Sequence, residues 1–177
     1  MFLNYRTQGL ILKKEDRGEA DRLFTVYTKD FGKLRILARS VRKISSKLRS
    51  GAEIFYLSEL EFIQAKRHKT LTGAVPIEDF KNLRSDLNRM KVAYQIAEAL
   101  DDFIKGPEAD SRIWNLLLKV FRRLDSQKFP PENLKLLYRY FLFNFLSLMG
   151  YGIRPEEFKK LKSFTRSYLS GILGVVK

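Results

Sequence analysis

The sequence of 177 residues contains no cysteine and a single histidine, His68. The absence of cysteine excludes disulfides, thiolate zinc sites, iron–sulfur clusters and cysteine nucleophiles. One histidine provides neither a multi-histidine metal site nor a two-histidine acid–base pair. This histidine lies in the run Lys66-Arg67-His68-Lys69, where a turn or a phosphate contact is expected rather than catalysis. We therefore expect neither a metal centre nor a bound cofactor.

Phosphate-cradling glycine loops and long apolar runs are also missing. The glycines of the first half are scattered singly at turns, which gives no support for nucleotide hydrolysis. Charged residues interrupt the N-terminal segment, and Arg139 and Asn144 break the most apolar stretch, residues 136–149. Neither a signal peptide nor a membrane span is expected. The sequence thus favours a cytoplasmic protein that does not bind membrane.

One acidic cluster stands out, formed by Glu15, Asp16, Glu19 and Asp21. Clustered carboxylates bind divalent ions in nucleases, but no histidine or second carboxylate cluster supports such a site here. A turn between two strands, whose carboxylates pair with Arg17 and Arg22, is the favoured interpretation. We therefore expect a protein that is not an enzyme.

The abundant feature is positive charge, since 34 lysines and arginines against 20 acidic residues give a net charge of +14. The excess is present in both halves of the chain. The electrostatic field of this net charge attracts polyanions. Nucleic acid is the first candidate, anionic membrane the second and acidic protein tails the third.

The charge is most concentrated between residues 33 and 49, which contain no acidic residue. This segment holds Lys33, Arg35, Arg39, Arg42, Lys43, Lys47 and Arg49. Residues 40–50, here called the basic loop, are too rich in serine and cations for a strand, yet they join two predicted strands. Such a run is often only a solvated face. Its place in a flexible loop on a rigid scaffold favours phosphate binding.

Short apolar runs of period two predict five strands in the first part of the chain. They cover about residues 9–14, 22–28, 33–38, 54–63 and 71–75. A five-stranded OB-type barrel is the leading candidate, because a small closed barrel removes sheet edges. The turn before the last strand carries Lys66, Arg67 and Lys69, and so adds a second basic rim loop. Aromatic candidates for base stacking are Tyr27, Phe31, Phe55 and Tyr56, although rings within strands more often belong to the core.

Near Phe80 the period changes to 3.6, which predicts helices. The first apolar stripe is Leu83, Leu87, Met90, Tyr94, Ala97, Leu100 and Ile104. A second helix is expected from a cap at Ser111 to Leu124, and a third from Pro130-Pro131 to just before Gly150, apolar nearly all round and hence central in a bundle. A fourth covers residues 156–169. The predicted class is α+β, with an OB-fold barrel at 1–79 and an all-α helical bundle at 80–177.

The order of several motifs resembles the RecO family of bacterial DNA repair proteins. The first motif is Gly18-Glu19-Ala20-Asp21-Arg22-Leu23-Phe24-Thr25. Gly32-Lys33-Leu34, Ala38-Arg39-Ser40-Val41-Arg42-Lys43 and Ser46-Lys47-Leu48 follow it, and the resemblance continues through Leu71-Thr72 and residues 87–100 to Leu148-Met149-Gly150-Tyr151. Ser40 stands where family members often have glycine, which stiffens the basic loop slightly.

The resemblance implies an OB fold followed by a helical domain, with nucleoid-associated work in the cytoplasm. It also implies binding of single- and double-stranded DNA, annealing of complementary strands, and loading of RecA together with RecR and single-stranded DNA-binding protein. The cations that match family positions are Arg35, Arg39, Arg42, Lys43 and Lys47. Charge alone extends the site to Lys33, Arg49, Lys66, Arg67 and Lys69. Many members carry a four-cysteine zinc module after the Gly-Tyr motif; this chain resembles a short form that lacks it.

Two alternatives remain open. In the first, the protein is an adaptor whose third helix, with Lys159, Lys160, Lys162 and Arg166, binds an acidic and hydrophobic peptide of a partner. In the second, the barrel binds RNA, because sugar recognition leaves no legible trace in the sequence.

Overall fold

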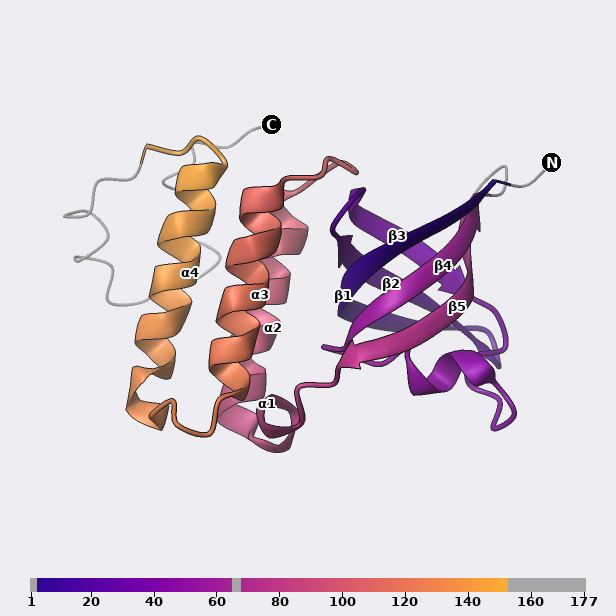
Figure 1. Cartoon of the computed structure of the whole chain (residues 1–177), viewed down its shortest axis with the longest axis horizontal. Helices are drawn as coiled ribbons and strands as arrows, with labels where there is room; N and C mark the ends of the chain where they lie inside the picture. The colour runs from indigo at the N-terminus through magenta and orange to yellow at the C-terminus, as the bar shows by residue number, and fades with distance from the viewer. Residues whose placement is uncertain (1–2, 65–67, 153–177) are drawn as a thin grey trace.

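The computed structural model describes residues 3–64 and 68–152, and these residues form a closed β-barrel followed by helices. The barrel lies at one side of the molecule and helices α2, α3 and α4 stand at the other (Figure 1). This arrangement confirms the predicted α+β class, with the barrel first and the helices second.

Five strands form the barrel, and all five were predicted. They are β1 (Asn4–Arg17), β2 (Asp21–Thr28), β3 (Gly32–Ala38), β4 (Leu57–Gln64) and β5 (Lys69–Glu78). Their order around the barrel is β1-β2-β3-β5-β4, and β1 closes it by antiparallel pairing with β4. The pair β3 and β5 is parallel, with Ile36 opposite Lys69. The closed five-stranded barrel confirms the OB-type fold.

Alternation along the strands sends cations outward. On β3, Leu34, Ile36 and Ala38 are buried in the barrel core, whereas Arg35 is exposed. Lys33 and Leu37 share its outward side, because successive side chains of a strand point to opposite faces. The strand period thus places the cations of β3 outside the barrel.

The helices are α1 (Lys81–Ser85), α2 (Leu87–Phe103), α3 (Ser111–Asp125) and α4 (Leu134–Leu148), with short 3-10 helices η1 (Lys47–Ser50) and η2 (Pro131–Asn133). The first predicted helix is divided at Asp86. Its carboxylate accepts hydrogen bonds from the backbone N–H of Asn88 at 2.8 Å and Arg89 at 3.1 Å, which caps α2. Asp110 caps α3 in the same way, so the predicted cap at Ser111 is wrong by one residue.

Two details of helix packing differ from the prediction. Leu87 is 84% and Tyr94 44% exposed, because α2 buries the side lined by Ala93 and Ile96 instead. Within the described residues α4 lies at the outer edge, packed on α2 and α3, rather than at the centre of the bundle (Figure 1). Its Leu136 is 63% exposed. The fourth predicted helix, residues 156–169, lies outside the described residues.

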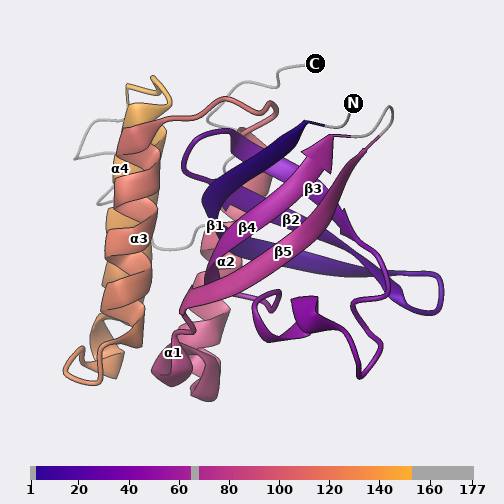
Figure 2. The ribbon, with the colours of Figure 1, turned by 45° about the vertical axis from the view of Figure 1, so that its right-hand side comes forward.

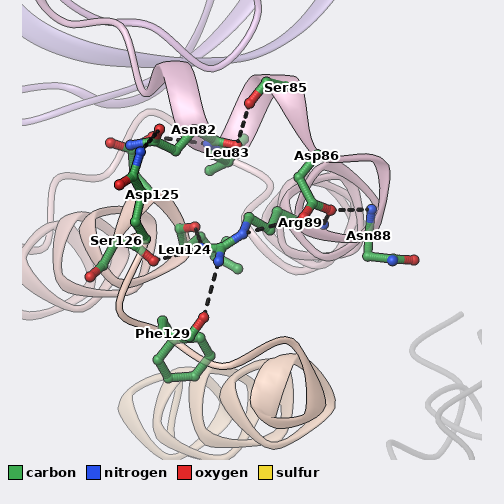
Figure 3. A network of polar contacts seen from close by, with 11 residues as sticks. Asn82, Leu83, Ser85, Asp86, Asn88, Arg89, Leu124, Asp125, Ser126 and Phe129 are labelled. Atoms are coloured by element: carbon green, nitrogen blue, oxygen red, sulfur yellow. Dashed lines mark hydrogen bonds and ion pairs between the residues drawn. The ribbon is translucent and has the colours of Figure 1, made fainter.

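Arg89 is buried among the helices, which the apolar stripe did not predict. Its side chain is 8% exposed, and its guanidinium donates hydrogen bonds to the carbonyls of Leu124, Ser126 at 2.9 Å and Phe129 at 3.0 Å (Figure 3). These carbonyls lie in the last turn of α3 and just after it, where the helix dipole also favours a cation. Arg89 therefore fixes the connection between α3 and α4.

A hydrophobic core continues from the barrel into the helices. Phe55, before β4, and Phe80, after β5, lie with their ring centroids 5.7 and 5.8 Å from that of Phe121 on α3. Leu10 and Tyr27 on the outer side of the barrel join the same core. Because barrel and helices share this core, the boundary at residues 79 and 80 stays a prediction. No described helix is long and apolar enough to span a membrane.

Candidate nucleic-acid interface

The basic loop crosses one end of the barrel between β3 and β4. Figures 1 and 2 show its η1 segment away from α4, beside the barrel. Val41 and, just after the loop, Ala52 are buried in the barrel core, and Leu48 packs against it. The structure places turns and η1 in this loop, whose flexibility stays a prediction. Because Val41 and Leu48 pack on the barrel core, the cations of the loop lie on a segment that is anchored to the barrel.

Gly51 lets the loop approach the barrel closely. A Cβ at this position would lie 2.3 Å from the carbonyl oxygen of Ala74 on β5, which is closer than real Cβ contacts. The hydroxyl of Ser58 donates a hydrogen bond of 2.7 Å to the Gly51 carbonyl. The end of the loop is thus held against β5 and β4.

Four predicted cations are exposed and carry no ion pair to any residue that the structure describes. They are Arg39, Lys43, Lys47 and Arg49. Their neighbours in sequence offer no carboxylate, and no described carboxylate reaches them from another element. These four charges are available to an external anion.

Two other predicted cations are partly compensated by β1. Arg35 lies 3.0 Å from the carboxylate of Glu15, and Arg42 lies 3.6 Å from that of Asp16. Asp16 also accepts a 2.8 Å hydrogen bond from Arg22, which together with Arg42 lowers the pKa of the Asp16 carboxyl. The predicted pairing of the acidic cluster with Arg22 is confirmed.

Arg17 is a candidate that the sequence did not reveal. It was predicted to pair with the acidic cluster, but it is exposed at the end of β1 and carries no ion pair within the described ranges. Asp16 lies opposite Arg22 in the pairing of β1 with β2, so its carboxylate meets Arg22, and sequence spacing alone does not reveal this register. In those same ranges no three potential metal ligands come together.

Lys33 occupies a different place, at the junction of barrel and helices. Its ammonium lies 2.8 Å from the carboxylate of Asp101 on α2, and its side chain is 13% exposed. Lys33 is thus separated from the cations of the basic loop by its position and by its carboxylate partner.

The second basic loop meets the barrel at the start of β5. Lys69 lies opposite Ile36 of β3, so it is close to the end of β3 from which Arg39 and the basic loop continue. Lys66 and Arg67 lie outside the described residues. The described part of this loop therefore adds Lys69 to the same end of β3.

The predicted stacking rings are mostly structural. Tyr27 and Phe55 are fully buried, so their assignment to base stacking is wrong. The Tyr56 ring lies under the guanidinium of Arg84 at 4.6 Å. Phe31 is partly buried and packs edge-on against Phe62. Tyr27 on β2 and Phe55 just before β4 belong to the core that the barrel shares with the helices. Charge is therefore the main feature that the basic loop offers to a ligand.

A pocket of about 890 Å³ lies between α3 and α4. Leu118, Phe129 and Leu136 contribute apolar surface, and Lys119 and Arg123 stand in its lining. It combines exposed apolar surface with positive charge. The predicted partner-binding residues Lys159, Lys160, Lys162 and Arg166 lie outside the described residues.

The closed five-stranded barrel, with its strand order β1-β2-β3-β5-β4, places the protein in the class of OB-fold proteins, many of which bind oligonucleotides or oligosaccharides. Two family models match the chain: "Recombination protein O N terminal" over residues 1–80 and "Recombination protein O C terminal" over residues 84–157. The chain belongs to the RecO family of DNA repair proteins.

Curated relatives agree with this assignment. A "DNA repair protein RecO" of Dehalococcoides mccartyi strain BAV1 is 33% identical over 177 residues, covering 98% of this chain and 68% of its own. The protein of the same name from D. mccartyi strain 195 is 33% identical over 153 residues, covering 86% and 58%. That of Roseiflexus sp. strain RS-1 is 32% identical over 155 residues, covering 88% and 52%. The chain thus spans about half to two thirds of the length of these relatives.

Proposed function

We propose that this protein binds single- and double-stranded DNA through the basic-loop surface and anneals complementary strands during recombinational repair. The basic-loop surface comprises Arg39, Arg42, Lys43, Lys47 and Arg49, together with Arg17 and Lys69. Lys66 and Arg67 extend it by charge and sequence position. The observation that carries this proposal is the group of four exposed cations without a carboxylate partner in the described residues.

Charge neutralisation is the physical mechanism. Two DNA strands repel each other, and a surface of cations holds both phosphate backbones close while the bases pair. Each phosphate contact releases counterions and adds about 0.7 to 0.9 to the slope of log affinity against log salt. Annealing by this route requires no catalytic residue, so we propose a protein without enzymatic activity that works in the cytoplasm at the nucleoid.

The mediator role adds protein partners. We propose that the protein acts with RecR to load RecA on DNA coated by single-stranded DNA-binding protein. The pocket between α3 and α4 supports a peptide contact, because apolar side chains and cations together fit a partner segment that is acidic and hydrophobic. Arg89 supports this pocket, because its guanidinium donates hydrogen bonds to the carbonyls of Ser126 and Phe129, and both residues line the pocket.

Annealing of strands already coated with single-stranded DNA-binding protein tests the mediator role, since many polycations aggregate naked strands. We expect acceleration by the wild type at moderate salt without nucleotide or metal. The basic-loop triple variant (Arg39→Ala, Lys43→Ala, Lys47→Ala) should lose it, whereas a control triple variant (Lys91→Ala, Lys128→Ala, Lys135→Ala) should not. If the protein anneals naked strands but not coated strands, the proposal of DNA binding stands and the mediator role is overturned.

The peptide contact is tested separately. Leu136→Asp places a carboxylate in the pocket and should weaken binding of the partner while DNA affinity stays within about twofold. Leu87→Asp is the matched control, because Leu87 is an exposed leucine on α2 outside this pocket. Equal loss of partner binding in both variants would argue against this pocket. Loss of partner binding with intact coated-strand annealing would show that the pocket binds a partner but is not needed for annealing.

A further inference from the structure

The basic loop begins in a conformation that needs support. Ser40, the residue after Arg39, has φ 54°, in the left-handed region that few residues other than glycine adopt. Its backbone N–H donates a hydrogen bond of 2.7 Å to Oδ1 of Asp21, the first residue of β2. The carboxylate of Asp21 therefore holds the residue at which the chain turns from β3 into the loop.

Two further contacts tie the same part of the loop to residues 18–20, the turn between β1 and β2. The backbone N–H of Arg42 donates to the carbonyl of Ala20 at 3.0 Å, and its guanidinium donates to that of Gly18 at 3.3 Å. Arg42, the first cation of the loop, is thus held by the turn just before Asp21 rather than by the strands that the loop connects.

A carboxylate on a DNA-binding surface opposes phosphate by Coulomb repulsion. Electrostatics alone therefore requires DNA affinity to rise when any carboxylate near the basic loop is removed. A carboxylate that shapes the loop has the opposite effect, because cations held in place lose less conformational freedom on binding. The two effects differ in sign, so they can be separated by experiment.

We infer that Asp21 is a positioning residue of the DNA-binding surface: its carboxylate holds Ser40 so that Arg39, Arg42 and Lys43 are presented together. This inference rests on the proposed function. It assigns Asp21 a role through Ser40 and no direct contact with DNA.

Three variants test it. Asp21→Ala removes the charge and the hydrogen bond, and DNA affinity should fall about tenfold, a factor equal to ~1.4 kcal/mol. Asp21→Asn keeps an oxygen acceptor for Ser40 and should retain at least wild-type affinity. Glu19→Gln is the charge control, because Glu19 is exposed in the same turn and has no ion pair with any described residue. This variant should bind DNA up to about threefold more tightly.

A fourth variant keeps the test valid if Asp21→Ala is poorly folded. Ser40→Gly in the Asp21→Ala background relieves the left-handed conformation at residue 40, and we expect recovery of part of the DNA affinity. Affinity of Asp21→Ala equal to or above that of Glu19→Gln would overturn the inference. Wild-type DNA affinity in the basic-loop triple variant would instead overturn the proposed function. The failure of the inference and the failure of the proposed function are therefore distinguishable.

Discussion

The ammonium of Lys33 lies 2.8 Å from the carboxylate of Asp101, and this ion pair joins β3 of the barrel to the last turn of α2. Lys33 also donates a hydrogen bond of 2.8 Å to the Asp101 carbonyl. The hydrogen bond from Lys33 lowers the pKa of the Asp101 carboxyl. A cation that was predicted to contact DNA thus connects the two parts of the molecule.

Loss of this ion pair should reduce stability without affecting DNA binding. Asp101 is 43% exposed, so we expect Asp101→Asn to lower the free energy of unfolding by up to about 1 kcal/mol at pH 7. Because the folded-state pKa of Asp101 is depressed, its contribution is present above its ordinary value of 3.8 and is lost as pH falls through the folded value. Urea unfolding at pH 7 and at acidic pH measures the difference. If Lys33→Met lowers DNA affinity as much as Lys43→Ala does, Lys33 contacts DNA and this account of its role is wrong.

Removal of the Arg89 side chain should be among the most damaging single changes in the helices. Arg89→Ala leaves three carbonyls near the end of α3 without their donor, and we expect a loss of about 2–4 kcal/mol. Arg89→Lys replaces the planar guanidinium by a compact ammonium, which cannot reach all three carbonyls, so it should recover only part of the lost free energy of unfolding. Chemical denaturation measures both. Arg112→Ala, at a position with 67% side-chain exposure, is the control and should cost under about 1 kcal/mol.

Alkaline pH should destabilise the fold through two tyrosines. Burial raises the pKa of Tyr27 and of Tyr138 to about 12, from an ordinary value of 10.0. Between these values the unfolded chain has lost protons that the folded chain keeps, so the free energy of unfolding falls with pH, by less than about 1.4 kcal/mol per pH unit for each tyrosine. Tyr27→Phe should reduce the slope of unfolding free energy against pH. An unchanged slope between pH 10 and 12 in this variant would show that the Tyr27 hydroxyl titrates normally.

Gly51 tests the attachment of the basic loop to the barrel. Gly51→Ala places a Cβ against the Ala74 carbonyl, so we expect destabilisation by about 1–3 kcal/mol and weaker DNA binding as the loop shifts. A Cβ at Gly106 meets nothing within 4 Å, and Gly106→Ala should change stability by less than about 0.5 kcal/mol. Thermal unfolding and DNA titration of both variants provide the comparison. Wild-type DNA affinity in a destabilised Gly51→Ala protein would show that DNA binding does not depend on the position of the loop against β5.

The strands were largely predictable because alternation in the sequence is the physical cause of the barrel core. Leu34, Ile36 and Ala38 point inward, and the cations between and beyond them point outward as expected. The first part of β1 was missed, because polar residues there are held by backbone pairing with β4, from Asn4 opposite Ile63 to Leu10 opposite Leu57. Backbone pairing of polar residues leaves little trace in a hydrophobic pattern.

The pairing of charges was much less predictable. The segment around the basic loop contains no acid, yet Lys33 and Arg35 meet carboxylates of α2 and β1, and Lys33 lies 68 residues from its partner. Arg89 was likewise missed, since a buried cation among apolar neighbours has no spacing rule. The fold therefore separates cations that are already paired from Arg39, Lys43 and their exposed neighbours, which the sequence alone treats alike.

The salt dependence of DNA affinity tests the central claim most directly. Equilibrium binding of one labelled single strand is measured over a range of salt for the wild type, the basic-loop triple variant and the control triple variant. If the basic-loop surface contacts phosphates, the slope of log affinity against log salt should fall in magnitude by about 2 for the basic-loop triple variant, that is about 0.7 for each lost contact. The control triple variant should keep the wild-type slope. Equal slopes for all three proteins would contradict DNA binding by the basic loop.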